Sequence, residues 1–361
     1  MSTFAKKSFD AVAYAASRPS YPPALFKHVL AYLDDTPARH TSPRTLLDCG
    51  CGPGLSTFDW MPAFDRIVAV DPSPGMITAA ARLYESKLRD GSLPAHAAAV
   101  EFHVARADRL PQPAVQDASV DLAVAGQAAH WFDPDATYRE LARVLKPGGA
   151  FAFWGYGEFY FPTRPDLSAL IPPYSAGTLG PSWEQPGRSI VEHLLVPFPF
   201  PRQRDDDPDH VASGFDPTSY TRSFFLREPP RRATGGDSGG ATGQTRLPFE
   251  LEGLDPDAPS GVYTLDPPAP DQTRTVYLTR SGTPLLTREW TLPQLVGYLR
   301  TWSAAHAYNE QSRARGVGRD CVDDFVAELQ THGLGLGLDD HDKTIRVAWD
   351  VGLIMGRKKR Q

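Results

Sequence analysis

The sequence predicts an α/β protein built on a doubly wound, mostly parallel sheet. Short apolar runs alternate with amphipathic segments through the first 156 residues, and such alternation is typical of a parallel sheet that helices cover on both faces. A glycine-rich turn, "CGCGPG", directly follows the first apolar run, as in strand-to-helix connections that bind anions or nucleotides. The apolar runs lie at 45–47, 66–70, 100–104, 120–125 and 150–156.

The segments between the apolar runs carry the signals of helix ends. The segment 73–88 opens with Ser73, a favoured N-cap, followed by Pro74, and its apolar residues recur at helical spacing. The segment 133–145 opens in the same way with Asp133 and stops at the glycines of "KPGG". We therefore expect two helices that connect neighbouring strands.

The composition changes after residue 156 and indicates three regions. The stretch of about 200–275 is rich in glycine and proline, so we expect a partly disordered insertion there. Helical spacing returns in "LPQLVGYLRTWSAAHAY" and at 321–331, and "TIRVAWDVGLIMGRK" has the residues of a closing strand. The sequence thus predicts a core with an N-terminal lid segment at 1–156, a substrate cap at 157–310, and a return to the core sheet at 311–361.

The overall composition narrows the class of protein. The chain of 361 residues has a net charge of −6 and a pI of about 5.9, which gives no electrostatic reason to expect nucleic-acid binding. It has no run of ~18 apolar residues, so no membrane span is expected, and its first residues lack the apolar centre of a signal peptide. Cys49 and Cys51 have no companion ligands for a zinc site. We expect a cytoplasmic protein without a metal, with its basic tail "GRKKRQ" solvated rather than acting as a nuclear signal.

The residues around the glycine turn indicate which ligand it binds. Gly50, Gly52 and Gly54 follow the pattern G-x-G-x-G, whereas dinucleotide-binding folds use G-x-G-x-x-G. Asp48 precedes the turn, and its charge would repel a pyrophosphate but suit a cofactor with an ammonium group. Asp71 ends the next apolar run and suits the two hydroxyls of a ribose. S-adenosylmethionine has a ribose, an ammonium and a sulfonium but no phosphate, so it fits better than a nicotinamide dinucleotide.

Four motifs then extend this interpretation to a known family. "LLDCGCGPG", "VAVDPSPGMI", "VDLAVAGQAAHWFD" and "VLKPGGAFAFWGYG" occur in this order, and they resemble the motifs of class I S-adenosylmethionine-dependent methyltransferases. "YAASRPSYP", "HWFD", "WEQPGRSIV" and "LRTWSAAHAY" resemble, more narrowly, the small-acid methyltransferases of the trans-aconitate and cantharidin type. The resemblance implies a Rossmann-like, seven-stranded doubly wound sheet with an inserted helical or irregular cap.

The resemblance also implies roles on the cofactor side. Asp48 would lie near the cofactor ammonium, Asp71 would bind the ribose hydroxyls, and Met76 would pack on the adenine. Arg18 would meet the cofactor carboxylate, although a surface arginine is an equally good interpretation. Arg106 departs from the family, because many members carry an acid there. The implied cofactor-binding residues are Tyr14, Arg18, Tyr21, Asp48, Gly50, Gly52, Gly54, Asp71, Met76, Ala107, Asp108 and Gln127.

Aromatic residues are the candidates for the acceptor pocket. Methyl transfer from a sulfonium is a one-step displacement, so the pocket must align the reactants and exclude water. A carboxylate acceptor is ionised at pH 7 and needs no base, whereas a hydroxyl acceptor needs one, for which His130 is the first choice. Core packing is the alternative interpretation for the tryptophans. The candidates are His130, Trp131, Trp154, Tyr156 and Trp302.

The sequence-based hypothesis is methyl transfer from S-adenosylmethionine to an oxygen of a small molecule, with a carboxylate preferred. A hydroxyl or nitrogen of a secondary metabolite is the alternative acceptor. Two alternatives of other classes stay open: a nicotinamide-dependent dehydrogenase, which the glycine spacing disfavours, and a cofactor-binding protein without catalysis. The oligomeric state is left open.

Overall fold

A computed structural model describes most of the chain. The described residues are 14–15, 17–35, 43–93, 98–201, 214–226, 284–316 and 318–360, with the backbone of two further strands at 262–264 and 274–278. Most of the insertion expected at 200–275 lies outside these residues. None of the helices in the described part is long and apolar enough to cross a membrane.

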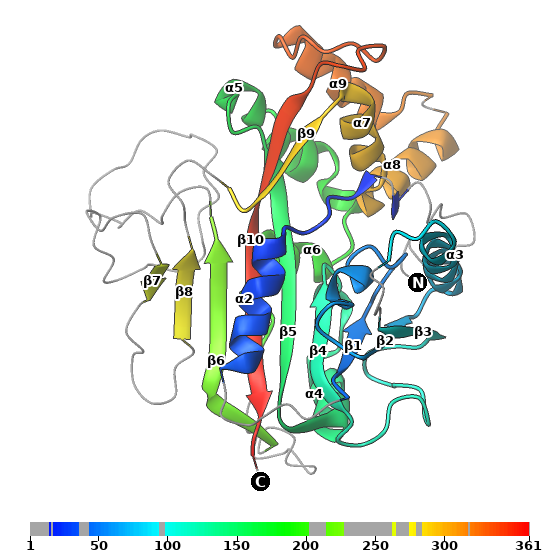
Figure 1. The fold of residues 1–361 in the computed structure, drawn as a ribbon. Helices are drawn as coiled ribbons and strands as arrows, with labels where there is room; N and C mark the ends of the chain where they lie inside the picture. Colours follow the sequence, from blue (N-terminus) through cyan, green and yellow to red (C-terminus); the bar gives the residue numbers. More distant parts are fainter. Residues whose placement is uncertain are drawn as a thin grey trace, which may run out of the picture.

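A sheet of ten strands organises the described chain (Figure 1). The strands β3, β2, β1, β4 and β5 all run parallel to their neighbours. β10 runs antiparallel to β5, to β6 and to β9, and β8 and β7 continue the sheet beyond β6. In spatial order the strands are β3 (Ala99–Val104), β2 (Arg66–Asp71), β1 (Thr45–Cys49), β4 (Val120–Gly126), β5 (Leu145–Tyr160), β10 (Ile345–Lys358), β6 (Phe215–Phe225), β8 (Arg274–Leu278) and β7 (Val262–Thr264), with β9 (Leu286–Trp290) beside β10.

The doubly wound α/β architecture is confirmed, but the sheet has ten strands rather than the expected seven. β7, β8 and β9 are the additional strands, and β9 is accommodated because β10 is long. The first part of β10 pairs with β9 and its later part with β6, while β5 covers its other edge. The strands β6 to β9 therefore take part of the segment 157–310 into the sheet, and the expected boundary at residue 156 falls inside β5.

The expected helices form where the capping signals predict them. The Ser73 hydroxyl accepts a hydrogen bond from the Met76 N–H at 3.4 Å, and the Asp133 carboxylate accepts one from the Ala136 N–H at 3.0 Å. The helical stretch expected from Leu292 onward is divided into α7 and α8. The helices are α2 (Pro23–Asp34), α3 (Pro74–Arg89), α4 (Pro134–Val144), α5 (Pro165–Ser168), α6 (Gly187–Glu192), α7 (Leu292–Arg300), α8 (Ser303–Ala314) and α9 (Cys321–Thr331).

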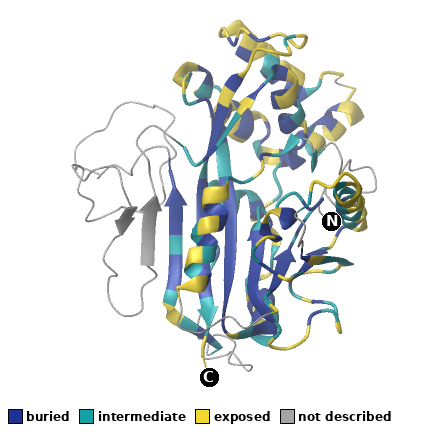
Figure 2. Cartoon of the chain, viewed as in Figure 1, coloured by how far each residue is buried: buried dark blue, intermediate teal, exposed yellow. Residues whose placement is uncertain are grey.

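Two hydrophobic clusters lie on opposite faces of the sheet, whose central strands are buried (Figure 2). Successive residues of a strand point to opposite faces, so Leu46 belongs to one cluster and Leu47 to the other. Helix α2 packs on the first face and crosses in front of the sheet in Figure 1, whereas α4 packs on the second face. Helices therefore cover both faces, as the strand–helix alternation predicts.

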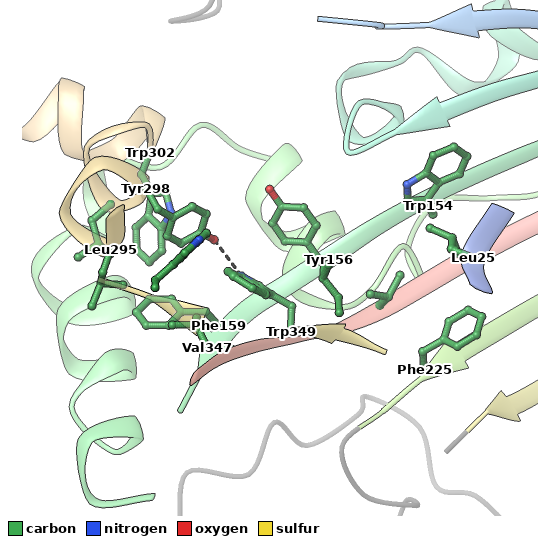
Figure 3. Packing of buried hydrophobic residues seen from close by; sticks show 14 of the residues in the cluster. Leu25, Trp154, Tyr156, Phe159, Phe225, Leu295, Tyr298, Trp302, Val347 and Trp349 are labelled. Carbon is green, nitrogen blue, oxygen red and sulfur yellow. Dashed lines mark hydrogen bonds between the residues drawn. The ribbon is translucent and has the colours of Figure 1, made fainter. Parts of the chain in front are cut away.

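Aromatic side chains connect the sheet to the helices α7 to α9 at one end of the molecule. The Tyr298 hydroxyl accepts a hydrogen bond from the Trp349 indole N–H at 3.0 Å, and both rings are buried (Figure 3). Trp302 packs on Phe159 and Tyr298 with ring centroids 5.9 and 5.8 Å apart. This cluster holds α7 and α8 against the upper parts of β5 and β10.

The strand order reverses between β1 and β4, and this reversal positions the site. The loops that follow two such strands diverge and leave a crevice at their carboxyl ends. The loop after β1 begins at Gly50, and the loop after β4 contains Gln127 and Ala128. A Cβ on Gly50 would lie only 2.5 Å from the Ala128 Cβ, so glycine is needed for the two loops to meet.

Candidate active site

Backbone hydrogen bonds hold the glycine turn after β1, and its glycines adopt left-handed backbone conformations. The N–H groups of Gly50 and Cys51 both donate to the Val70 carbonyl, at 2.7 and 3.0 Å. Gly50 and Gly52 have φ of +73° and +56°, which glycine adopts without strain. Apart from its chain neighbours, no described residue has an atom within 4 Å of where a Cβ on Gly52 would be, so the backbone at Gly52 is open to a ligand.

Asp71 ties the end of β2 to this turn. Its carboxylate accepts hydrogen bonds from the Gly52 N–H at 3.0 Å and from the Ser73 N–H at 2.8 Å. Burial raises the pKa of Asp71, and the two backbone hydrogen bonds oppose that shift. A carboxylate has about four lone-pair sites, so Asp71 retains capacity for the two hydroxyls of a ribose.

A cavity of about 410 Å³ opens at the carboxyl ends of the parallel strands, and we call it the cofactor cavity. It lies at the reversal between β1 and β4, where ligands bind in open α/β sheets. The structure brings ten of the twelve predicted cofactor residues together in its wall: Tyr14, Arg18, Tyr21, Gly50, Gly52, Asp71, Met76, Ala107, Asp108 and Gln127.

The other two predicted residues, Asp48 and Gly54, do not line the cavity. Asp48 is 1% exposed and accepts a hydrogen bond from the Thr57 hydroxyl at 2.7 Å, so its carboxylate faces the interior behind the turn. Burial raises its pKa to about 6, and the Thr57 hydrogen bond opposes the shift. Gly54 packs against the Phe58 ring, which would lie 3.3 Å from an added Cβ. The proximity of Asp48 to a cofactor ammonium therefore stays a prediction, and its side chain would act from behind the turn.

Arg106 forms an ion pair with Asp108 at the wall of the cavity. Its Nη2 lies 2.6 Å from Asp108 Oδ2, and its Nε donates to Oδ1 at 2.8 Å. This pairing lowers the pKa of Asp108 and keeps the carboxylate ionised. Ala107, 6% exposed, offers its backbone beside this pair. Arg106, which stands where many family members carry an acid, therefore pairs with the Asp108 side chain, and Asp108 still lines the cavity.

Arg18 reaches across the mouth of the cavity from the N-terminal segment. Its guanidinium donates to the Tyr156 hydroxyl at 3.0 Å and to the Thr301 carbonyl at 3.2 Å. It also lies over the Tyr14 ring, 4.7 Å from its centroid, and its Nε is buried with no hydrogen-bond partner among the described residues. Among the described residues, no carboxylate forms an ion pair with Arg18. Its charge is therefore available to an anionic group of a ligand.

Gln127 is held in an unusual backbone conformation by its own side chain. It has φ of +54°, which is uncommon for a residue with a Cβ. Its amide nitrogen donates to the Tyr156 carbonyl at 3.2 Å, and its amide oxygen accepts from the Tyr156 N–H at 2.8 Å. The side chain thus acts as a further peptide group of β4 and fixes Tyr156, which in turn holds Arg18.

A second, smaller space adjoins the first. It has a volume of about 90 Å³ and lies between the end of β5, helix α6 and the junction of α7 and α8, and we call it the acceptor chamber. Five residues line both spaces: Tyr14, Arg18, Gln127, Trp131 and Tyr156. The two spaces therefore adjoin at these five residues, so that ligands in the two spaces would lie next to each other.

Four of the five predicted pocket residues line the chamber: His130, Trp131, Tyr156 and Trp302. The fifth, Trp154, lines neither space and is completely buried. Its indole lies beside Gly126, where an added Cβ would be 2.9 Å away, and it meets the Tyr21 ring edge-on at 5.4 Å. Trp154 is therefore a core residue, and Figure 3 shows it well apart from Trp302 within the same hydrophobic cluster.

His130 is a neutral imidazole at physiological pH. Burial lowers its pKa to about 3, with a smaller contribution from the Arg18 cation. Its Nδ1 is buried and has no hydrogen-bond partner within the part of the chain that the structure describes. Because His130 lines the chamber, this atom is available to a polar group of a ligand there.

Sequence reasoning missed several residues of the chamber wall. Trp183 and Arg188 lie in the quoted segment "WEQPGRSIV", so a signal existed for them. Glu158 follows Tyr156 by two positions in β5, and the period-two rule places both on one face. Tyr298 arrives from α7 and has no local signal, because only the packing of α7 brings it to the chamber.

The glycine turn, Asp71 and a cavity at the reversal of the sheet define a Rossmann-like domain that binds a nucleoside cofactor. Residues 47–153 match the family model described as a methyltransferase domain. The match runs from β1 into β5, which is the part of the chain that forms most of the cofactor cavity.

Individual relatives agree with this match. A probable S-adenosylmethionine-dependent methyltransferase of Saccharomyces cerevisiae is 27% identical over 164 residues, which are 45% of this chain and 51% of that protein. An uncharacterized methyltransferase of Mycobacterium tuberculosis is 36% identical over 137 residues, 38% of this chain and 46% of that protein. The chain thus spans about half the length of these curated relatives.

One solved structure supports the fold over almost the whole chain. It is a putative type II methyltransferase from Anaeromyxobacter dehalogenans, which is 24% identical in sequence, with a TM-score of 0.55. The match covers 95% of this chain and 99% of that chain. Residues 47–153 therefore form a methyltransferase domain with a Rossmann-like fold, and at the level of this domain the predicted class and the cofactor S-adenosylmethionine are confirmed. The trans-aconitate or cantharidin type stays a prediction.

Proposed function

We propose that the protein transfers a methyl group from S-adenosylmethionine to a carboxylate oxygen of a small molecule. The observation that carries this proposal is the shared wall between the cofactor cavity and the acceptor chamber. Methyl transfer requires the donor and the acceptor to meet in line, and two adjoining spaces suit that geometry. The residues of the cofactor cavity all fall within 1–156, and most of the chamber wall falls within 157–310, which supports the proposed division into a core and a substrate cap.

The residues of the cofactor cavity fit the methyl donor. Asp71 would accept the ribose hydroxyls, and the open backbone at Gly52 would lie along the methionine half. Met76, which is 4% exposed in the first turn of α3, would pack on the adenine. Arg18 would meet the cofactor carboxylate with its guanidinium, because among the described residues it has no carboxylate partner. Asp48 would act on the ammonium only through its charge, from behind the turn.

The chain's contribution to the reaction is alignment and a dry environment. When bound, S-adenosylmethionine supplies an electrophilic methyl group, and the acceptor oxygen forms the new C–O bond as the C–S bond breaks and the thioether leaves. Tyr14 and Tyr156 place aromatic faces at the shared wall, and such faces stabilise a nearby cation. Orientation of this kind contributes roughly 7–11 kcal/mol in well-aligned cases.

The protonation of His130 favours a carboxylate acceptor over a hydroxyl. A general base works best when its pKa lies near the working pH, and a pKa of about 3 makes His130 a weak base. A carboxylate is already ionised at pH 7 and needs no base. Neutral His130 would instead donate a hydrogen bond from Nδ1 to the acceptor, in the tautomer that protonates this atom.

Two measurements test the proposal. Calorimetry should detect binding of S-adenosylmethionine and S-adenosylhomocysteine but not of NAD. Binding of NAD alone would contradict the proposed methyltransferase activity. Mass spectrometry of small carboxylic acids, phenols and amines incubated with the protein and S-adenosylmethionine should detect methyl esters. If phenols or amines are methylated and no esters form, the acceptor is a hydroxyl or a nitrogen rather than a carboxylate. Cofactor binding with no methylated product and no S-adenosylhomocysteine formed would indicate a binding protein without catalysis.

A further inference from the structure

The acceptor chamber contains a second arginine, and its charge is already neutralised. Arg188 Nη2 lies 3.0 Å from Glu158 Oε1, and the two side chains are only 10% and 19% exposed. Arg188 Nε also lies 3.5 Å from Glu192 Oε2, and the guanidinium stacks on the Trp183 ring, 4.3 Å from its centroid. A buried guanidinium that is held on several sides stays in place, so Arg188 is not free to pair with a ligand.

The remaining charges of the chamber leave room for one anionic group. Arg18 faces both spaces and, by the proposed function, pairs with the cofactor carboxylate. The sulfonium then balances one acceptor carboxylate. Glu158 offsets Arg188. Among the described residues of the wall, no further cation is then left for a second acceptor carboxylate, and burial of a carboxylate without a partner is strongly unfavourable.

The chamber is also small. Its volume of about 90 Å³ is less than the roughly 150 Å³ of a cavity that holds benzene, so the acceptor group that enters it is small. Trp183, Tyr298 and Trp302 form much of the wall. The chamber thus suits the carboxylate and the first few carbon atoms of an acid, and these aromatic rings suit an apolar or unsaturated carbon chain.

We propose, on the basis of the proposed function, that the acceptor is a small acid with a single carboxylate, and that the Glu158–Arg188 ion pair rejects acids with a second one. Glu158 is then a specificity residue: by holding Arg188 it removes the cation that a second carboxylate would need. Its role concerns which acid is accepted and not the transfer step itself.

The test compares acids that share a skeleton but differ in charge. Monomethyl fumarate and fumarate have nearly the same shape, with one and two carboxylates, and crotonate provides a smaller acid with one. Ester formation by the full-length protein is followed by mass spectrometry, with S-adenosylhomocysteine as the second product. We expect kcat/KM for monomethyl fumarate and crotonate to exceed that for fumarate at least tenfold. Equal or better use of fumarate would overturn the inference and leave the proposed function standing.

Substitution of Glu158 tests the assigned cause. Glu158→Gln keeps the shape of the side chain and releases Arg188 from its main partner, so the preference for monomethyl fumarate over fumarate should fall at least threefold. Asp166→Asn, in the exposed Arg164–Asp166 ion pair, is the matched control and should leave the preference unchanged. An unchanged preference in a folded Glu158→Gln variant would exclude Glu158 as the specificity residue.

A variant that fails to fold is recognised by its thermal melting curve, and the wild-type comparison of the three acids then decides the inference by itself. The outcomes also separate the two proposals. If the protein forms no ester with any acid but methylates phenols, the carboxylate acceptor of the proposed function fails, and this inference falls with it. If esters form but diacids are preferred, only this inference fails.

Discussion

The cofactor cavity and the acceptor chamber are built in different ways, although they share a wall. The cofactor cavity uses loops at the ends of the parallel strands β1, β2 and β4, and its main contacts are backbone groups and short side chains such as Gly52 and Asp71. The chamber uses long side chains, including Arg188 from α6 and Tyr298 from α7. The strand ends fix the first space, whereas packing between distant segments fixes the second.

This difference separates what is common to the domain from what is particular to the chain. The segment 47–153 that matches the methyltransferase domain supplies most of the cofactor cavity, and residues beyond it supply most of the chamber. Substitutions in the first space should therefore change cofactor affinity, and those in the second should change turnover and acceptor choice. Four predictions follow in order of decreasing effect; three of them test this separation, and the second concerns Asp48, which lies behind the glycine turn.

The largest effect is expected for Asp71→Ala. The substitution removes the acceptor of the Gly52 and Ser73 N–H groups and the proposed acceptor of the ribose hydroxyls. Hydrogen bonds to a charged group contribute about 1.5–3 kcal/mol each, so affinity for S-adenosylmethionine should fall about 100-fold or more by calorimetry. Asp90→Ala, at an exposed helix end, is the control. An unchanged affinity in Asp71→Ala would break the assignment of the cofactor cavity.

The second prediction concerns stability at Asp48. Its pKa is about 6 in the folded protein, against 3.8 for an ordinary aspartate, so the unfolded chain loses this proton first as the pH rises. Between about pH 4 and 6 the folded state binds more protons, and stability therefore falls with rising pH. Above pH 6 the cost is constant, at about 3 kcal/mol from the shift.

Asp48→Asn removes that charge and retains an acceptor for the Thr57 hydroxyl. Its free energy of unfolding should exceed that of the wild type by up to about 3 kcal/mol at pH 7.5 and by much less at pH 4. Urea unfolding at the two pH values measures the difference. A gain of the same size at both pH values would show that ionisation of Asp48 is not its cause.

The third prediction concerns Arg18, which lies on the shared wall. Arg18→Lys keeps the charge but loses the two directed hydrogen bonds to Tyr156 and Thr301. Cofactor affinity and kcat should both fall about tenfold, since about 1–2 kcal/mol is lost with such contacts. Arg164→Lys at the surface should change neither. If only cofactor affinity or only kcat changed, Arg18 would act in one of the two spaces and not in both.

The smallest effect is expected for His130→Ala. Loss of a hydrogen bond to the acceptor should lower kcat/KM for the acceptor roughly fivefold, in line with about 1 kcal/mol, and leave cofactor affinity unchanged. Because the pKa of His130 is about 3, the wild-type pH–rate profile should have no inflection near pH 6.5. An inflection there that disappears in the variant would make His130 the base for a hydroxyl acceptor.

The sequence predicts the local geometry around the glycine turn well because its signals are local. The glycine spacing, Asp71 and the helix caps at Ser73 and Asp133 act over a few residues, and the structure has them as expected. Asp48 is the exception, because the pattern identifies an acid but not the Thr57 hydroxyl that turns it inward.

The acceptor side could be predicted only in part. Trp154 and Tyr156 are two positions apart and therefore lie on the same face of β5. The sequence alone cannot distinguish the tryptophan packed beside Gly126 from the tyrosine that lines the chamber. Arg188 and Tyr298 come from helices whose positions depend on long-range packing. The three additional strands were missed for the same reason, since strand pairing depends on residues far apart in the chain.

The five residues of the shared wall have a thermodynamic consequence. If the cofactor orders Arg18 and Tyr156 on binding, the acceptor no longer bears that entropic cost, and its affinity rises. Linkage requires the reverse effect to be equally large, so the acceptor must tighten the cofactor by the same factor. Donor and acceptor would then bind with positive heterotropic cooperativity, because both contact the five residues of the shared wall.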